Sequence, residues 1–185
     1  CENAFKLCSA LESVVIPDSV TSIGYEAFYN CSSLMGIEIP DSVTTIDKYA
    51  FSYCENLASV KIGKGVTTMG SYAFSYCFKL VDLTIEYGVT SIGYSAFCGC
   101  DGLASVTIPD SVTSIGDYAF RNCSSLTSIV IPDSVTSIGD SAFEYCTSLE
   151  SVTIGDSVTD ICEGAFEGCI SLTSITVDAN NAFYS

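Results

Sequence analysis

The chain has 185 residues, with 22 acidic and 6 basic side chains, a formal net charge of −16 and no histidine. So few basic residues leave no positive surface for phosphate backbones or anionic lipids, which argues against nucleic-acid and membrane-surface binding. The absence of histidine excludes Ser-His and Cys-His catalytic arrangements and histidine-containing zinc sites. Apolar residues make up 48% of the chain, but polar residues break every apolar run before the roughly 20 residues that a membrane helix requires.

Phenylalanine recurs every 23 residues, which is typical of a repeat protein. Each Phe follows an Ala, and each is followed by Cys three residues later and by Leu six residues later, as in Ala27, Phe28, Cys31 and Leu34. This spacing of three predicts a tight helical or 3₁₀ turn. The eight positions are Phe5, Phe28, Phe51, Phe74, Phe97, Phe120, Phe143 and Phe166.

The rest of each repeat predicts two extended segments. An alternating apolar pair such as Val60 and Ile62 predicts a short strand. A turn follows, written Pro-Asp-Ser in four repeats, and Pro ends the strand because it has no N–H to donate. The sequence Val-Thr-x-Ile-Gly, as at 112–116, predicts a second short segment, after which Gly permits a change of direction.

These repeats predict a solenoid, because one 23-residue unit cannot bury its apolar positions alone. We expect a single domain over residues 1–185, with about eight coils stacked at the strand spacing of about 4.8 Å. Cys1 falls in mid-repeat, and residues 178–185 depart from the pattern where Asn181 and Tyr184 replace Val and Ile. Both ends predict that the chain is part of a longer polypeptide.

The units 108–126 and 131–149 read Ile-Pro-Asp-Ser-Val-Thr-Ser-Ile-Gly, then Ala-Phe-x-x-Cys-x-x-Leu. They resemble BspA-type leucine-rich repeats, a family of bacterial and protozoan surface proteins. The resemblance implies an α/β solenoid, a right-handed superhelix with short parallel strands on its concave face and short 3₁₀ or helical turns on its convex face. It also implies a secreted or surface location and adhesion to host proteins, extracellular matrix or other microbes, and it supplies no catalytic residues.

Eight of the eleven cysteines occupy the repeated column after Phe. Stacked side chains that point the same way keep their Cβ atoms farther apart than a disulfide prefers, so we expect buried free thiols. A linear stack offers no tetrahedral arrangement, so we expect no metal site. Three cysteines lie outside the column: Cys1, Cys98 and Cys162, of which we place Cys98 on the outer face.

Outward residues of the predicted strands form the candidate contact surface on the concave face. Most are Ser or Thr, and departures from this pattern are the candidates for specificity. The candidate residues are Glu38, Lys61, Asp82, Thr84, Thr107, Val130 and Thr153. The alternative is an ordinary strand surface, in which Glu38 and Lys61 form an ion pair between neighbouring strands.

Three further columns each allow two interpretations. An unbroken column of threonines, from Thr21 to Thr159, suggests hydroxyls bonded to one another or to adjacent backbone, with a flat ice-binding array as the alternative. Asp residues at the turns suggest turn capping, with bridging Ca²⁺ as the alternative. Tyrosines that flank most of the Phe turns, from Tyr25 to Tyr145, suggest packing between coils, with an aromatic contact surface for protein or sugar as the alternative.

We therefore expect a non-enzymatic extracellular or cell-surface binding or adhesion module without a cofactor. Its partner is expected to be a host-surface or matrix protein or a glycan, with no nucleic-acid binding and no membrane insertion, and the chain is expected to be monomeric. The alternative is a structural spacer in a multidomain surface protein, including one whose enzyme domain lies elsewhere in the polypeptide.

Overall fold

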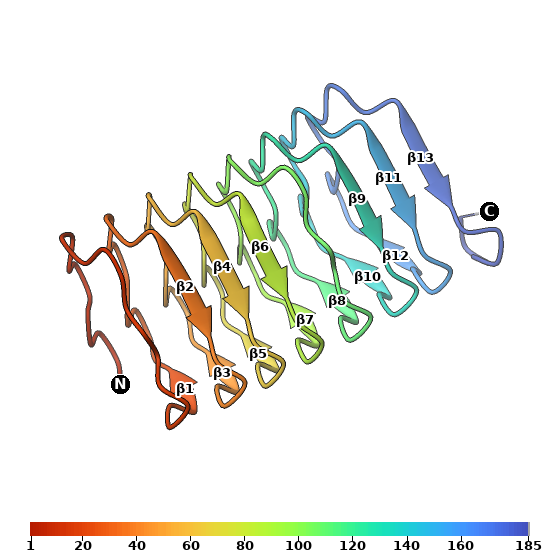
Figure 1. Ribbon diagram of the computed structural model, residues 1–185. Coiled ribbons are helices and arrows are strands. Elements are labelled where there is room, and N and C mark those ends of the chain that lie inside the picture. The colour runs from red at the N-terminus through yellow and green to blue at the C-terminus, as the bar shows by residue number, and fades with distance from the viewer. Residues whose placement is uncertain (185) are drawn as a thin grey trace.

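A computed structural model describes residues 1–184 as a stack of similar coils with the two termini at opposite ends (Figure 1). One face carries the longer strands β2 (Gly36–Ile39), β4 (Ser59–Ile62), β6 (Asp82–Ile85), β9 (Ser128–Ile131), β11 (Ser151–Ile154) and β13 (Ser174–Val177). We call it the long-strand face. Two-residue strands lie across the core: β1 (Ser22–Ile23), β3 (Thr45–Ile46), β5 (Thr68–Met69), β7 (Ser91–Ile92), β8 (Ser114–Ile115), β10 (Ser137–Ile138) and β12 (Asp160–Ile161). The fold is a β-solenoid of about seven turns.

Every strand pairing is parallel and joins residues 23 positions apart, as in Val60 with Leu83 and Ser114 with Ser137. The long strands form two sheets, β2-β4-β6 and β13-β11-β9, and the short strands form β1-β3-β5 and β12-β10-β8-β7. This register confirms the 23-residue period and the two extended segments of each coil. It also places each core residue directly above its counterpart in the preceding coil.

The core consists of continuous columns of identical or similar side chains. Consecutive Phe rings stack with centroids 5.0–5.5 Å apart, and the five from Phe51 to Phe143 are fully buried. A second column consists of leucines, of which the six from Leu34 to Leu149 have zero exposure. Parallel stacking therefore buries apolar area that a single coil would leave in water.

The expected helical or 3₁₀ turns are wrong, because the described residues contain no helix. The Ala-Phe-x-x-Cys segment consists of successive tight turns, with bonds from Ala27 N to Gly24 O at 3.1 Å and from Cys31 N to Phe28 O at 3.2 Å. Their third residues have positive φ, 51° at Glu26 and 54° at Asn30. Such turns repeat the spacing of three without a helix, so the sequence pattern alone does not distinguish them.

Hydrogen bonds between coils hold these turns in a left-handed conformation that non-glycine residues rarely adopt. Phe28 N donates to Ala50 O at 2.7 Å, and Asn30 N donates to Ser52 O at 2.8 Å. Bonds of this kind recur along the stack. Two positions in each coil therefore have positive φ whichever residue occupies them, including Tyr53 at 61°.

The long sheet is interrupted where we predicted two further strands. Residues 13–16 and 105–108 carry the alternating apolar pattern but are not paired as strands. Elsewhere the residue after each long strand donates its N–H to the preceding coil: Gly63 N to Ile39 O at 3.0 Å and Glu86 N to Ile62 O at 3.0 Å. This last bond helps to close the ladder between two coils.

Proline occupies that donor position at each interruption. Pro40 follows β2, Pro109 follows residues 105–108 and Pro132 follows β9, and none of them has an N–H to donate. The four paired junctions instead carry Gly63, Glu86, Gly155 and Asp178 at this position. We attribute the division of the long sheet to proline at the end of the downstream coil.

The C-terminal segment departs from the repeat as expected. Asn181 is buried and donates to Gly155 O and Val158 O at 2.9 and 3.0 Å. It also accepts hydrogen bonds from the backbone N–H groups of Phe183 and Tyr184. Asn181 therefore replaces an apolar column residue with a side chain that bonds to the edge of the last coil; Ser185 lies outside the described residues.

Candidate functional site

Strand alternation positions the outward side chains of the long-strand face. In β4 and β6 the residues alternate between exposed and buried, so Val60 and Ile62 enter the core while Lys61 points outward. The register aligns Glu38, Lys61 and Thr84 in one row across β2, β4 and β6. Asp82 lies in the neighbouring row, beside Ser59.

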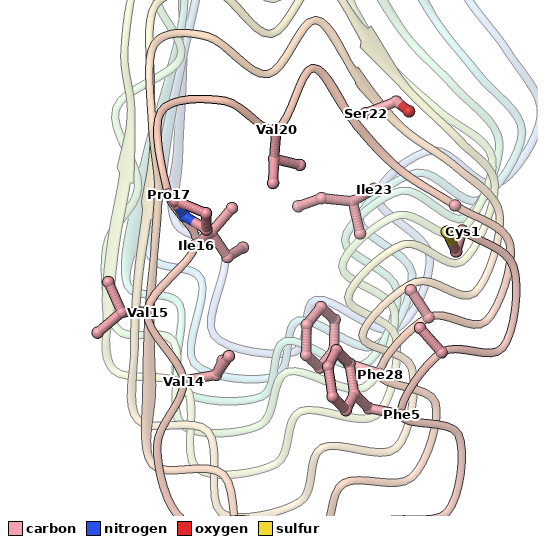
Figure 2. Close-up of a pocket in the computed structure, with 13 residues that line it drawn as sticks. Cys1, Phe5, Val14, Val15, Ile16, Pro17, Val20, Ser22, Ile23 and Phe28 are labelled. Carbon is pink, nitrogen blue, oxygen red and sulfur yellow. The ribbon is translucent and has the colours of Figure 1, made fainter.

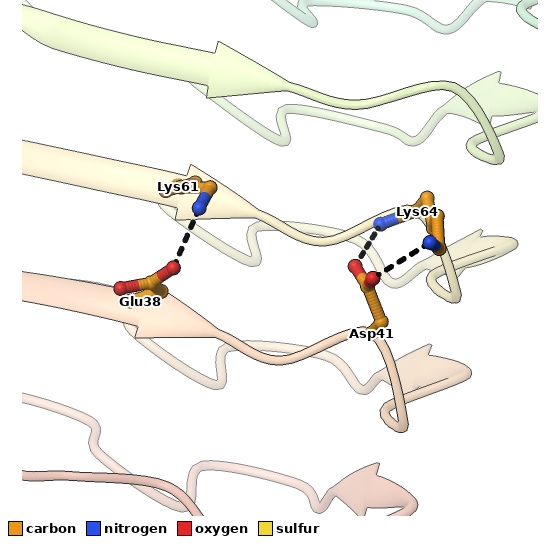
Figure 3. A network of polar contacts seen from close by, with 4 residues as sticks. All are labelled: Glu38, Asp41, Lys61 and Lys64. Atoms are coloured by element: carbon orange, nitrogen blue, oxygen red, sulfur yellow. Dashed lines mark hydrogen bonds and ion pairs between the residues drawn. The ribbon is translucent and has the colours of Figure 1, made fainter. Parts of the chain in front are cut away.

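Glu38 and Lys61 form an ion pair across β2 and β4, with Oε1 and Nζ 2.6 Å apart (Figure 3). The hydrogen bond to Glu38 raises the pKa of Lys61. A shallow hollow of about 300 Å³ lies over these residues and includes Asp82 and Thr84. The structure therefore brings four of the seven candidate residues together, and we call them the charged patch: Glu38, Lys61, Asp82 and Thr84.

A second ion pair extends this charge toward the turn edge of the same two coils. Lys64 Nζ lies 3.1 Å from Asp41 Oδ2, and the backbone N–H of Lys64 donates to Asp41 Oδ1 at 3.0 Å (Figure 3). The hydrogen bonds from the side chain and backbone of Lys64 lower the pKa of Asp41. Each ion pair has a net charge of zero. The Glu38–Lys61 pair lies on the long-strand face, and the Asp41–Lys64 pair lies at its edge.

Val130 and Thr153 lie in a different hollow, of about 480 Å³, over β9 and β11. Val130 is 60% exposed, and its surroundings include Asp110, Asp133 and Asp178. Thr107 lies in the unpaired segment 105–108 and lines neither hollow. Six of the seven candidates thus form two patches, and Thr107 lies in the interruption of the sheet between them.

Sequence reasoning missed a buried column directly after Phe. Ser52 and Ser75 are fully buried and their Oγ atoms lie 2.8 Å apart. Cys98 is the next member and is only 6% exposed, so it is buried although it is not part of the core cluster. The small residues Ser, Ser and Cys at 52, 75 and 98 were the available signal.

The same column continues with Arg121 and Glu144. Arg121 Nε lies 2.8 Å from Glu144 Oε2, although the N–H bond is not directed at that oxygen. The guanidinium also lies over the rings of Tyr118 and Tyr145, 5.4 and 5.9 Å from their centroids. Arg121 therefore ties the column to the aromatic surface beside it.

The cysteine column is held by a repeated sulfur hydrogen bond. From Cys31 to Cys169, the Sγ of each ladder cysteine donates to the carbonyl oxygen of the Phe in the preceding coil, as in Cys54 to Phe28 and Cys77 to Phe51 at 3.2 and 3.3 Å. Burial raises the pKa of Cys31 to about 11 and that of Cys54 to about 12. All eleven cysteines are free thiols, and residues 1–184 contain no metal-binding group of His, Cys, Asp or Glu.

The other polar columns bond mainly to backbone. Each Thr Oγ1 from Thr44 to Thr159 donates to the carbonyl of the preceding Thr, at 3.1–3.3 Å. Asp117 and Asp133 each accept a bond from the backbone N–H of the following coil, at 3.0 Å. These contacts favour the structural interpretation of both columns.

Tyrosines stack between coils on the side of the Phe turns. One row runs through Tyr25, Tyr49, Tyr72, Tyr94 and Tyr118, with centroids 4.8–6.1 Å apart. Another runs through Tyr29, Tyr53 and Tyr76, with separations of 5.6 and 4.7 Å. The prediction that the tyrosines pack between coils is confirmed.

A hollow of about 380 Å³ lies at the first coil, where Phe5 and Phe28 stack (Figure 2). Val14, Ile16 and Ile23 point into it. Its walls are residues of the core columns, which farther along the stack are covered by neighbouring coils, so we assign it no ligand. Among the described residues, no helix is long and apolar enough to cross a membrane.

Comparison with known proteins identifies the repeat. The profile of the BspA type leucine rich repeat region matches residues 1–127 and 67–184, with six copies. A leucine-rich repeat protein of T. pallidum, TpLRR, is 32% identical, with a TM-score of 0.75 over 78% of this chain and 71% of that protein. A leucine-rich repeat protein of Bacteroides ovatus is 28% identical, with a TM-score of 0.58 over 96% of this chain and 63% of that one.

The pneumococcal vaccine antigen PcpA shares the fold at 20% identity, with a TM-score of 0.61 over 85% of this chain and 48% of its own. This chain therefore spans only part of the length of each of these proteins. A search of curated proteins found no match.

Proposed function

Because the chain belongs to the BspA-type leucine-rich repeat family, we propose that it is an extracellular or cell-surface module that binds protein through its long-strand face. The partner is a host-surface or matrix protein, and the chain acts as a monomer without catalysis or cofactor. The observation that carries this proposal is the charged patch, which groups the three charged departures from a Ser and Thr surface in one shallow hollow.

The charged patch has the chemistry of a protein contact. Lys61 and Glu38 are 53% and 70% exposed, so their charges can exchange partners without the desolvation that buried charges require. Such exposed charges contribute mainly to specificity and association rate. The flat rows of Ser and Thr around them leave room for a broad, extended partner.

The proposal is tested by binding to immobilised matrix proteins, such as fibronectin and fibrinogen, and to host-cell membranes. The double variant E38A/K61A removes the ion pair on the face and leaves the net charge unchanged. The matched control D41A/K64A removes the ion pair at the edge. We expect the first to weaken binding about tenfold, about 1.4 kcal/mol, and the second to have little effect.

If the chain is a structural spacer, neither double variant should change binding. No saturable binding to any of these surfaces, or equal binding by both double variants, would overturn the proposal in favour of the spacer. Thermal unfolding of each variant shows whether the fold is intact. Hydrolase activity that a point substitution abolishes would overturn the non-enzymatic assignment.

A further inference from the structure

Another hollow lies away from the long-strand face, where four successive coils leave the Phe turns. It has a volume of about 360 Å³. Tyr76, Phe78 and Tyr145 provide its aromatic walls, and Asp101 and Asn122 provide polar groups between them. We call this hollow the aromatic trough; it shares no residue with the charged patch.

The trough lies where two successive members of a column are not tyrosine. The position two residues after Phe carries Tyr76 and Tyr145 at the two ends of the trough, with Gly99 and Asn122 between them. Gly99 has a φ of 72°, and a Cβ there would lie 2.7 Å from Cδ1 of Tyr76. The absent side chain opens the floor of the trough beside the Tyr76 ring.

The length of the trough limits the ligand. Tyr76 and Tyr145 lie three coils apart, and consecutive Phe rings in these coils are separated by 5.4–5.5 Å. The two aromatic ends are therefore roughly 15 Å apart at ordinary strand spacing. A single ammonium group requires its aromatic rings within about 6 Å, so a cage for one cation does not fit these dimensions.

The polar groups complete a surface suited to sugar. The carboxyl group of Asp101 can accept hydrogen bonds from a ligand in the trough, and partial burial raises its pKa. The side-chain amide of Asn122 lines the same hollow. Sugar hydroxyls would bond to both groups, while the apolar C–H faces of pyranose rings would pack on Phe78 and Tyr145, which are 39% and 43% exposed.

Two further observations define the ligand and the order of the site. The net charge of −16 disfavours sialylated or sulfated glycans. Arg121 lies over the Tyr145 ring and limits its movement. We propose that the aromatic trough binds a neutral di- or trisaccharide along the solenoid axis.

The experiment uses the full chain and three neutral probes: triacetylchitotriose, cellotriose and mannotriose. Saturation-transfer NMR detects contact, and calorimetry measures affinity. We expect at least one probe to bind saturably at millimolar concentration, and Y145A or F78A to weaken it about tenfold. G99N, which adds a side chain tolerated at positive φ, should block the floor and abolish binding.

Two controls separate this site from the rest of the surface. Y87A removes an aromatic side chain that is 69% exposed at a turn outside the trough, and should leave sugar binding unchanged. E38A/K61A should also leave it unchanged, so failure of the proposed protein-binding function and failure of this proposal are distinguishable.

Three results would overturn the proposal: no saturable binding of any neutral probe, equal losses in Y145A and Y87A, or tighter binding of tetramethylammonium or a hyaluronan tetrasaccharide. F78A provides a second test if Y145A does not fold.

Discussion

The backbone N–H of Gly63 donates a hydrogen bond of 3.0 Å to the carbonyl oxygen of Ile39, at the end of the ladder between β2 and β4. The equivalent position in the unpaired coil is Pro109, which has no N–H to donate to Ile85. One bond at the end of a strand thus distinguishes the paired from the unpaired junctions of the long sheet.

The unpaired segment should exchange its backbone hydrogens quickly. We expect the amides of residues 105–108 to exchange at least tenfold faster than those of β11, because β11 is paired on both sides. Hydrogen exchange followed by mass spectrometry measures this difference. P109A should slow exchange in the segment, whereas P17A, whose coil has no preceding coil among the described residues, should not. Equal protection of 105–108 and 151–154 would contradict this explanation.

The Phe column should make its largest contribution to stability at the centre of the stack. F97A removes a fully buried ring that stacks on both sides, and we expect it to lower the free energy of unfolding by about 3–5 kcal/mol. F5A removes a ring that is 42% exposed with one stacked neighbour, and its effect should be much smaller. Urea unfolding monitored by circular dichroism compares the two, and equal losses would argue against a shared column.

The buried thiols predict instability at high pH. The pKa of Cys54 is 9.0 in an ordinary environment and about 12 in the fold, so its stabilising contribution is complete below pH 9 and is lost as pH rises toward 12. In this interval each such thiol lowers the free energy of unfolding by up to about 1.4 kcal/mol per pH unit. Urea unfolding between pH 8 and 11 under reducing conditions, as compared with C54A, measures the effect. A pH dependence that C54A leaves unchanged would contradict it.

The same column should be chemically protected. In the native protein we expect iodoacetamide to modify the exposed Cys1 and Cys8 first, because the ladder thiols from Cys31 to Cys146 are buried and protonated. In denaturant without reductant, the ladder thiols should become reactive. Near-zero free thiol under those conditions would indicate disulfides and overturn this account.

Asn181 should stabilise the last coil. N181A leaves the carbonyls of Gly155 and Val158 without the donors they have in the structure, and we expect a loss of about 1–3 kcal/mol. N180A is the control, since Asn180 is exposed and bonds only locally to Asp178. Limited proteolysis should detect earlier cleavage near the C-terminus in N181A alone.

The sequence predicted the columns and the strands well because both depend on periodicity. Phe, Cys and Leu at fixed spacing identify the residues that stack, and Val60 with Ile62 identifies an inward-facing pair. The turn conformation was not predictable in this way, because Tyr53 is an ordinary residue that only the hydrogen bonds between coils hold at positive φ. A spacing of three is common to helical turns and to successive tight turns, so the helix was wrongly expected.

Only part of the candidate site could be predicted from the sequence, because the rest depends on contacts between coils. The 23-residue register predicted that Glu38 and Lys61 are neighbours. It did not predict the interruption of the long sheet that separates them from Val130, which depends on proline in the downstream coil. The aromatic trough depends on Gly99, which has no side chain at the position where the preceding coil has Tyr76.

The two kinds of sheet interruption do not coincide. The junction between β5 and β7 lacks a short-strand ladder, but the same coils are joined by β4 and β6. Where residues 105–108 leave the long sheet, β7, β8 and β10 remain paired. Under tension along the axis, coils that began to separate at a gap in one sheet would still be held together by paired strands in the other sheet. The described coils would therefore yield locally and re-form, instead of unravelling from a single break.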